Sequence, residues 1–177
     1  QSINFLQHED REAFLILFLP SISSYPSCLN VEKHLHLNMY VELHASSAFS
    51  FLQATSLPED LAAMAAQMDM PAIAIVDRDG IYGAPRFHLE AKRAGIRPHI
   101  GVELMLEGGY RCPLLIATRQ GYRNLCRLIT RMKMRARKGE GEVSFEELAE
   151  YATGLICLTG GCHGPLASTL RSGGMPA

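Results

Sequence analysis

The sequence contains no apolar stretch long enough to cross a membrane. Its longest apolar run, Ala13–Pro20, is far shorter than the roughly 20 residues that a membrane-spanning helix needs. The run follows a mainly acidic segment, residues 9–12, whereas a secretory signal carries basic residues at that place. We therefore expect neither a membrane segment nor an export signal, and no membrane partner.

Cysteine occurs without any pairing pattern. The cysteines are Cys28, Cys112, Cys126, Cys157 and Cys162. No two of them form a Cys-x-x-Cys pair, and an odd number gives no disulfide framework. This usage is typical of the reducing cytoplasm, so we expect a cytoplasmic protein.

The sequence also lacks an excess of either charge. It has 17 Lys and Arg against 18 Asp and Glu, a net charge of -1. A nucleic-acid-binding role would therefore have to come from a local cluster of basic residues. The glycine-rich nucleotide loops, the nucleophile elbow and the His-Glu-x-x-His pattern are absent as well.

What is present is enough for one ordinary hydrophobic core. The chain has 177 residues, of which 47% are hydrophobic and 20% charged, as in a folded domain. Residues 1–38 share no periodicity with the rest of the chain, and the patterned region opens at Met39. We predict an N-terminal extension over residues 1–38 and a domain over residues 39–177, with Met39 as the hypothetical natural start.

From Met39 onward, predicted strands alternate with predicted helices. The pattern Ser56-Leu57-Pro58-Glu59 has the form of a capping box at the start of a helix, and Ser144–Glu147 repeats it. Further helices are predicted over Tyr82–Ala94, closed by Gly95, and over Gln120–Arg135. The predicted strands begin at Val41 and cover Ala72–Val76, Ile100–Leu106, Leu114–Ala117 and Leu155–Leu158.

This alternation predicts an α/β fold with parallel strands and crossover helices, either an open sheet or a barrel. About five strands are too few to close the usual eight-stranded barrel. We therefore expect an incomplete barrel, from a fragment or a truncated gene product.

Three polar residues lie at or near the ends of predicted strands, where such folds carry their chemistry. They are His44, Asp77 and Glu103, and their types suit a metal site. A multi-metal hydrolase, however, needs His-x-His and Asp-His where this chain has His44-Ala45-Ser46 and Asp77-Arg78. The alternative is structural: each carboxylate caps a helix or pairs with Arg78 or Arg97, and His44 is a hydrogen-bonded histidine. The literal pair His34-Leu35-His36 has no strand context.

The clearest charge signal lies between Arg119 and Lys138, where every charged residue is basic. Its arginines recur at every fourth position: Arg119, Arg123, Arg127, Arg131 and Arg135. On a helix, this spacing gives one slowly winding basic stripe whose members repel one another by a few tenths of a kcal/mol per pair. The stripe is therefore not there for helix stability. Phosphates, an acidic protein surface and water remain alternative partners.

Several segments together resemble a known family. They are Y-V-E-L-H-A-S-S-A-F-S-F-L from Tyr40, V-D-R-D-G-I-Y-G-A from Val76, I-G-V-E-L from Ile100 and G-Y-R-N-L-C-R-L-I-T-R-M-K-M-R from Gly121. The region from Met39 to about Leu170 resembles the N-terminal PHP (polymerase and histidinol phosphatase) domain of bacterial C-family DNA polymerases of the polymerase III alpha-subunit type. The error-prone, damage-inducible branch is the most similar.

The resemblance implies an incomplete PHP-type barrel whose rim, in metal-binding members, holds several ions. His44, Asp77 and Glu103 match family ligand positions. Ser46, Gln53 and Arg78 stand where the family has other ligands, and a further family histidine is expected to fall at Cys112. Arg78 would place a permanent cation in the metal position, paired with Asp77 or Glu103.

The function implied is that of a non-catalytic PHP domain at the front of an error-prone DNA polymerase, which works in DNA replication and damage-tolerant repair. We expect no cofactor in this chain, with Mn or Zn as any residual ion and Mg in the parent polymerase. The expected partners are the remainder of the polymerase chain and DNA, reached through the arginine stripe. The alternative is a metal-dependent phosphoesterase or 3′-5′ exonuclease that uses His44, Asp77 and Glu103.

Overall fold

The computed structural model describes residues 40–137 and 139–173. The predicted extension at residues 1–38, with its apolar run and its histidine pair, lies outside these residues, as does Met39. In the part of the chain that is described, no helix is both long and apolar enough to cross a membrane.

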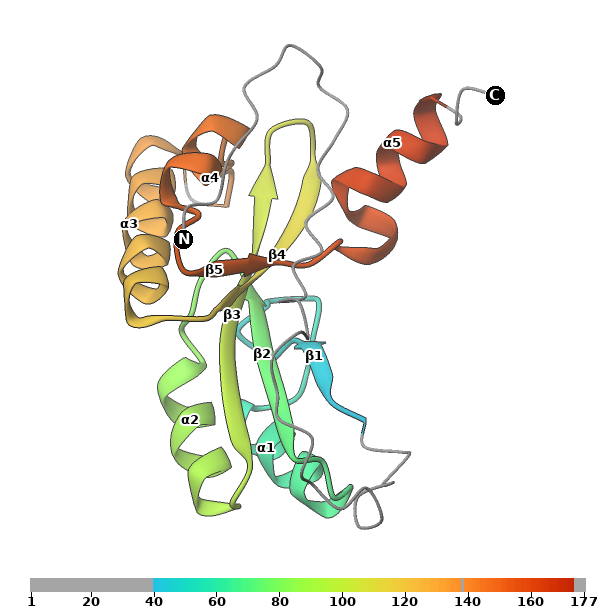
Figure 1. Cartoon of the computed structure of the whole chain (residues 1–177), viewed down its shortest axis with the longest axis vertical. Coiled ribbons are helices and arrows are strands. Elements are labelled where there is room, and N and C mark those ends of the chain that lie inside the picture. The colour runs from blue at the N-terminus through green and yellow to red at the C-terminus, as the bar shows by residue number, and fades with distance from the viewer. Residues whose placement is uncertain (1–39, 138, 174–177) are drawn as a thin grey trace, which may run out of the picture. The chain divides into compact units, whose positions relative to one another are not determined.

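A five-stranded sheet forms the centre of the described domain (Figure 1). Its strands are β1 (Glu42–Ala45), β2 (Ala72–Arg78), β3 (Arg97–Leu106), β4 (Tyr110–Ile116) and β5 (Leu155–Cys157), in the spatial order β1-β2-β3-β4-β5. β1, β2 and β3 are parallel, whereas β4 and β5 are each antiparallel to the strand before them. The α/β fold class is thus confirmed, but the sheet is mixed.

The prediction of parallel strands fails at β4 because β3 and β4 form a hairpin. Only three residues separate Leu106 from Tyr110, and a parallel connection needs a dozen or more. Gly108 and Gly109 have φ values of 86° and 78°, a conformation that glycine adopts without steric cost. They turn the chain back at once, so β4 begins at Tyr110, before the predicted Leu114.

Four helices follow from the local sequence: α1 (Pro58–Gln67), α2 (Ala84–Arg93), α3 (Arg119–Arg135) and α4 (Phe145–Tyr151). The capping box at Ser144 and Glu147 forms as predicted. The one predicted at Ser56 does not, because α1 starts after Leu57 with Pro58 in its first turn and no side-chain cap. Gly95 follows α2 at a φ of 76°, as predicted for a helix end.

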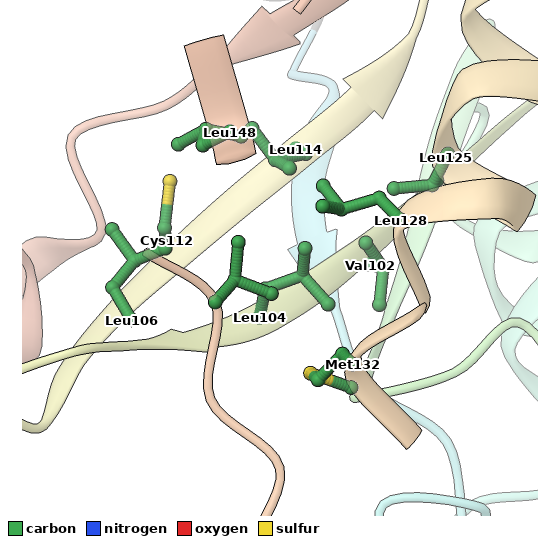
Figure 2. Close-up of a cluster of buried hydrophobic side chains, with 10 residues drawn as sticks. Val102, Leu104, Leu106, Cys112, Leu114, Leu125, Leu128, Met132 and Leu148 are labelled. Atoms are coloured by element: carbon green, nitrogen blue, oxygen red, sulfur yellow. The ribbon is translucent and has the colours of Figure 1, made fainter. Parts of the chain in front are cut away.

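All four helices cover one face of the sheet, which we call the outer face. α1 and α2 bury Ala62, Ala65, Phe87 and Ala91 against Ile73 and Ile75 of β2. α3 and α4 bury a second cluster against β3 and β4, and Figure 2 shows its side chains: Val102, Leu104, Leu106, Cys112, Leu114, Leu125, Leu128, Met132 and Leu148. Among the described residues, the opposite face, called the inner face, buries a small cluster of Ala74, Val76 and Leu115.

A close backbone contact fixes the start of α3 beside the turn that leads into β5. A Cβ added at Gly121 would lie 1.9 Å from the carbonyl oxygen of Gly154, so no side chain fits there. The backbone nitrogen of Ala117 donates to the same oxygen at 3.0 Å, and Asn124 donates to the Thr153 carbonyl at 3.0 Å. After β5 come a 3-10 turn, η1 (Gly161–His163), and α5 (Pro165–Gly173).

Candidate functional site

Strand register separates the candidate site residues into two groups. In the parallel pair β2–β3, Arg78 lies opposite Glu103, and Asp77 lies opposite Val102. Successive residues of a strand point to opposite faces. Val102 belongs to the cluster under α3, so Asp77 faces the helices. Arg78 and Glu103 therefore share the inner face.

The inner-face residues form a polar cluster around Glu103. His44 Nε2 donates to Glu103 Oε1 at 3.1 Å. Arg111 Nη1 lies 3.5 Å from Glu103 Oε2 and 3.5 Å from Gln53 Oε1. When the Gln53 amide is turned by 180°, its oxygen accepts from both Arg78 and Arg111. One carboxylate is therefore shared by a histidine and an arginine, and Gln53 links the two arginines.

Charge in this cluster shifts the pKa of both members of the His44–Glu103 pair. The hydrogen bond to Glu103 raises the pKa of His44, although partial burial opposes the shift. The same bond lowers the pKa of Glu103, and the positive charges of Arg111, His44 and Arg78 lower it further. Both shifts favour the charged pair.

Arg78 forms its ion pair with a carboxylate other than the two predicted. Its Nε lies 3.6 Å from Asp79 Oδ2, and Asp79 also accepts from the backbone nitrogen of Met105 at 3.2 Å. Burial raises the pKa of Asp79, an effect that the hydrogen bond from Met105 and the charge of Arg78 oppose. Arg78 still acts on Glu103 through its charge, as the lowered pKa of Glu103 reflects.

Asp77 anchors a loop. It is 2% exposed and accepts from the Ser47 backbone nitrogen at 2.7 Å, from Ser47 Oγ at 2.8 Å and from Ser50 Oγ at 2.8 Å. Ser50 Oγ in turn accepts from the backbone nitrogen of Arg78 at 3.1 Å. Sequence reasoning missed both serines, although their position directly after β1 was the available signal. Ser46 closes the same region by donating to the Val76 carbonyl at 3.0 Å.

The residues on the inner face do not fit a multi-metal centre. Among the described residues, no group of three or more His, Cys, Asp or Glu side chains is placed to hold a metal ion. Guanidinium groups have no lone pair to offer a metal, so Arg78 and Arg111 occupy space without coordinating. A bimetallic clamp needs two ions about 3.5 to 4 Å apart. The assignment of His44, Asp77 and Glu103 as residual ligands stays a prediction.

The residue of β4 that faces the site is Arg111, not Cys112. Cys112 lies opposite Leu104 and is 1% exposed within the outer-face cluster. Arg111 precedes it, so its side chain points to the inner face and reaches Glu103. Strand alternation decides which neighbour can reach the site, so Cys112 itself does not face it. The match of a family histidine to Cys112 stays a prediction.

The arginine stripe of α3 divides into two parts. A step of four residues advances about 400° around a helix, so each arginine lies about 40° further round than the last. Because of this rotation, Arg131 and Arg135 face α4. Arg131 lies 3.2 Å from Glu147 Oε1 and 3.0 Å from Glu150 Oε2. Arg135 also pairs with Glu147 and lowers the pKa of that carboxyl.

The first part of the stripe consists of Arg119, Arg123 and Arg127, which are all exposed. No described acidic group forms an ion pair with any of them. Thr118 caps the helix just before them by accepting from the Gly121 nitrogen at 3.1 Å. Of the alternatives that the sequence left open, an acidic protein surface thus accounts for Arg131 and Arg135 within the chain itself, while the other three arginines remain available to a partner.

Comparison with known proteins gives one family and a group of much longer relatives. The family described as "PHP domain" matches residues 42–177. An error-prone DNA polymerase of Anaeromyxobacter sp. (strain K) is 38% identical over 154 residues, which are 77% of this chain and 13% of the relative. A DNA polymerase III subunit alpha of Buchnera aphidicola is 35% identical over 142 residues, 76% of this chain and 12% of the relative.

Another error-prone DNA polymerase, from Symbiobacterium thermophilum, is 50% identical over 91 residues, 51% of this chain and 8% of the relative. The chain therefore spans only about an eighth of the length of the first of these relatives. Two solved structures are similar to part of the chain at low TM-scores. An amidohydrolase from Chromobacterium violaceum has a TM-score of 0.44 at 21% identity, covering 53% of this chain and 33% of its own. A metal-dependent phosphoesterase from Bifidobacterium adolescentis has a TM-score of 0.45 at 13% identity, covering 64% and 43%.

Proposed function

The chain belongs to the PHP domain family, and we propose that it is the N-terminal PHP domain of an error-prone DNA polymerase, where it acts as a non-catalytic scaffold. The observation that carries this proposal is the pair of arginines on the inner face. Arg78 and Arg111 surround Glu103, where the family resemblance places metal ligands. Cationic side chains then supply the positive charge that ions supply in metal-binding members.

The scaffold role is supported by the origin of the cluster in four neighbouring strands. His44 comes from β1, Arg78 from β2, Glu103 from β3 and Arg111 from β4. Their contacts run across the sheet and tie its strands together at one end. Each ion pair is partly exposed and contributes at most about 1 kcal/mol to folding stability. The sheet is therefore stabilised by these contacts together and not by any single pair.

The parent protein proposed here would add deoxynucleotides during damage-tolerant DNA synthesis in the bacterial cytoplasm. Its polymerase centre, with magnesium held by carboxylates, would lie outside the 177 residues of this chain. The remainder of the polymerase chain is then the first partner of the domain. Residues 39–177 form the part of the PHP domain present here, and no cofactor is assigned to it.

DNA is proposed as a second partner, reached through Arg119, Arg123 and Arg127. These three side chains are exposed, lie on successive turns of one helix and have no acidic partner among the described residues. Arginine binds phosphate groups through a planar set of donors. Arg131 and Arg135 are assigned instead to holding α4.

The first test is the metal content and activity of the purified chain. We expect no stoichiometric Mn or Zn by elemental analysis, and no cleavage of a phosphoester or of a 3′ DNA end. In Arg78→His/Arg111→His, two imidazoles replace two cations beside His44 and Glu103, so we expect this variant to retain zinc. The same exchange at the exposed Arg93 and Arg97 is the matched control and should leave metal content unchanged.

The opposite outcome supports the metal-dependent phosphoesterase or exonuclease. In that case the unaltered chain would bind about one Mn or Zn per molecule and cleave a phosphoester, and His44→Gln or Glu103→Gln would abolish both. Such a result would remove the basis for a non-catalytic scaffold, because the arginines would then coexist with a working ion.

A further inference from the structure

Two cysteines that are far apart in the sequence lie side by side in the sheet. Cys112 is on β4 and Cys157 is the last residue of β5, and their Sγ atoms are 3.3 Å apart. Leu114 is the register partner of Cys157, so the two cysteines are diagonal neighbours on adjacent strands. Sequence spacing gave no sign of this pairing because 45 positions separate them.

The two thiols have different surroundings. Cys112 is 1% exposed and is buried among the leucines of the outer-face cluster (Figure 2). Cys157 is half-buried and donates to the Leu158 carbonyl at 3.4 Å. The hydrogen bond between the thiols lowers the pKa of Cys157 and, together with burial, raises the pKa of Cys112. An oxidant from solvent would therefore meet Cys157 first.

The position of β5 allows the two sulfur atoms to approach. A disulfide bond is about 2.05 Å long, so the atoms must close by about 1.3 Å from their 3.3 Å separation. β5 has only three residues and, among the described strands, pairs with β4 alone. Movement of this edge strand would therefore disturb the hydrogen bonds between β4 and β5 and those of no other described strand pair.

We propose that Cys112 and Cys157 form a dithiol modification site, which hydrogen peroxide converts into an intrachain disulfide. The Cys157 thiolate attacks a peroxide oxygen, the O–O bond breaks, and the leaving hydroxide takes up a proton to form water. Cys112 sulfur then attacks the sulfenic sulfur of Cys157, so that the S–S bond forms as the S–O bond breaks. The hydroxide released from the sulfenic acid takes up the proton of Cys112 and forms a second water. In total, the two thiols lose two electrons, which reduce one peroxide molecule.

The disulfide would close a ring that contains both α3 and α4. The segment from Cys112 to Cys157 leaves the sheet, forms the arginine helix and α4, and returns as β5. A disulfide between Cys112 and Cys157 would hold β5 against β4. It would also lower the conformational entropy of the segment between them in the unfolded chain. This site is independent of the polymerase assignment.

The test uses the full chain with Cys28, Cys126 and Cys162 replaced by Ser, which leaves only the pair. The reduced protein is exposed to graded hydrogen peroxide, the remaining thiols are alkylated, and the digest is analysed by mass spectrometry. We expect both thiols to disappear together and a linked Cys112–Cys157 peptide to form. The protein should stay monomeric on a non-reducing gel and regain both thiols with dithiothreitol.

Two single replacements in the same background separate the roles of the sulfurs. Without Cys112, the sulfenic acid at Cys157 should persist and react with dimedone; without Cys157, Cys112 should resist peroxide. Peptide mapping of the unaltered chain repeats the test if the triple replacement does not fold. Oxidation of Cys157 to sulfinic acid while Cys112 stays free, or disulfides only between chains, would overturn the proposal.

Discussion

At the scale of single residues, strand alternation decides what Asp77 and Arg78 do. They are neighbours in the sequence, yet Asp77 binds two serines on the outer side and Arg78 joins the polar cluster on the inner face. The sequence predicted that Asp77 and Glu103 would converge. It could not show that strand alternation separates them, because the register of β2 against β3 is set by packing across the whole sheet.

The His44–Glu103 pair predicts a pH dependence of stability. The raised pKa of His44 gives stability that is present below its unfolded pKa of about 6.5 and is lost as the pH rises through the folded value. The lowered pKa of Glu103 gives stability that is present above about pH 4.3 and is lost as the pH falls. The pair should therefore stabilise the fold most between about pH 4.5 and 6.5.

The measurement is urea unfolding at pH 5.5 and at pH 8. We expect the contribution of the pair to fall by less than about 1 kcal/mol between them, since His44 is more than a third exposed. His44→Gln should remove this part of the pH dependence, and His163→Gln, at an exposed site, should not. An identical pH profile for His44→Gln and the unaltered chain would contradict the assignment.

At the scale of secondary-structure elements, local sequence patterns correctly predicted the features that a single segment determines. Helix α3, the capping box of α4 and the end of α2 at Gly95 formed as predicted. The box at Ser56 did not form because α1 begins at Pro58, so that Leu57 and not Ser56 holds the N-cap position. The hairpin of β3 and β4 was overlooked, although Gly108-Gly109 between two apolar runs is a recognised hairpin signal.

The division of the arginine stripe predicts two separable effects. Replacing Arg119, Arg123 and Arg127 by Gln should weaken binding to duplex DNA and reduce the slope of log affinity against log salt by about 2.7, since each lost phosphate contact removes about 0.9. Fluorescence anisotropy over a salt series measures this slope. The fold should be unaffected, because these side chains are exposed.

The matched control is Arg131→Gln/Arg135→Gln. These arginines are bound to Glu147 and Glu150, so their loss should weaken the packing of α4, seen as a lower urea midpoint of unfolding, and leave the salt slope unchanged. Equal DNA affinity for the triple variant and the unaltered chain would contradict the proposed DNA contact.

At the scale of the whole molecule, the described sheet ends in two strands with one partner each, β1 and β5. Unpaired strand edges invite further pairing, and the polymerase relatives continue far beyond the matched region. The sequence predicted an incomplete barrel from strand count alone. The strand count gives no partner for either edge, because strand pairing joins segments that are far apart in the sequence.

The proposed function predicts that the native gene product is much larger than the 19.5 kDa of this chain. An antibody raised against residues 121–137 should detect a band several times that mass in cell extract, because the domain would be joined to its polymerase. A single band at or below 19.5 kDa would contradict this, and would direct attention to an independent role for the domain.

The arginine-filled inner face has a consequence for the supply of trace elements. A domain whose central charges are ions must acquire them after synthesis, and its folded population then depends on their availability. The positive charges of Arg78 and Arg111, in contrast, are part of the polypeptide itself. On the proposed assignment, the domain matures without a loading step, and a bacterium starved of zinc or manganese would still produce it in folded form.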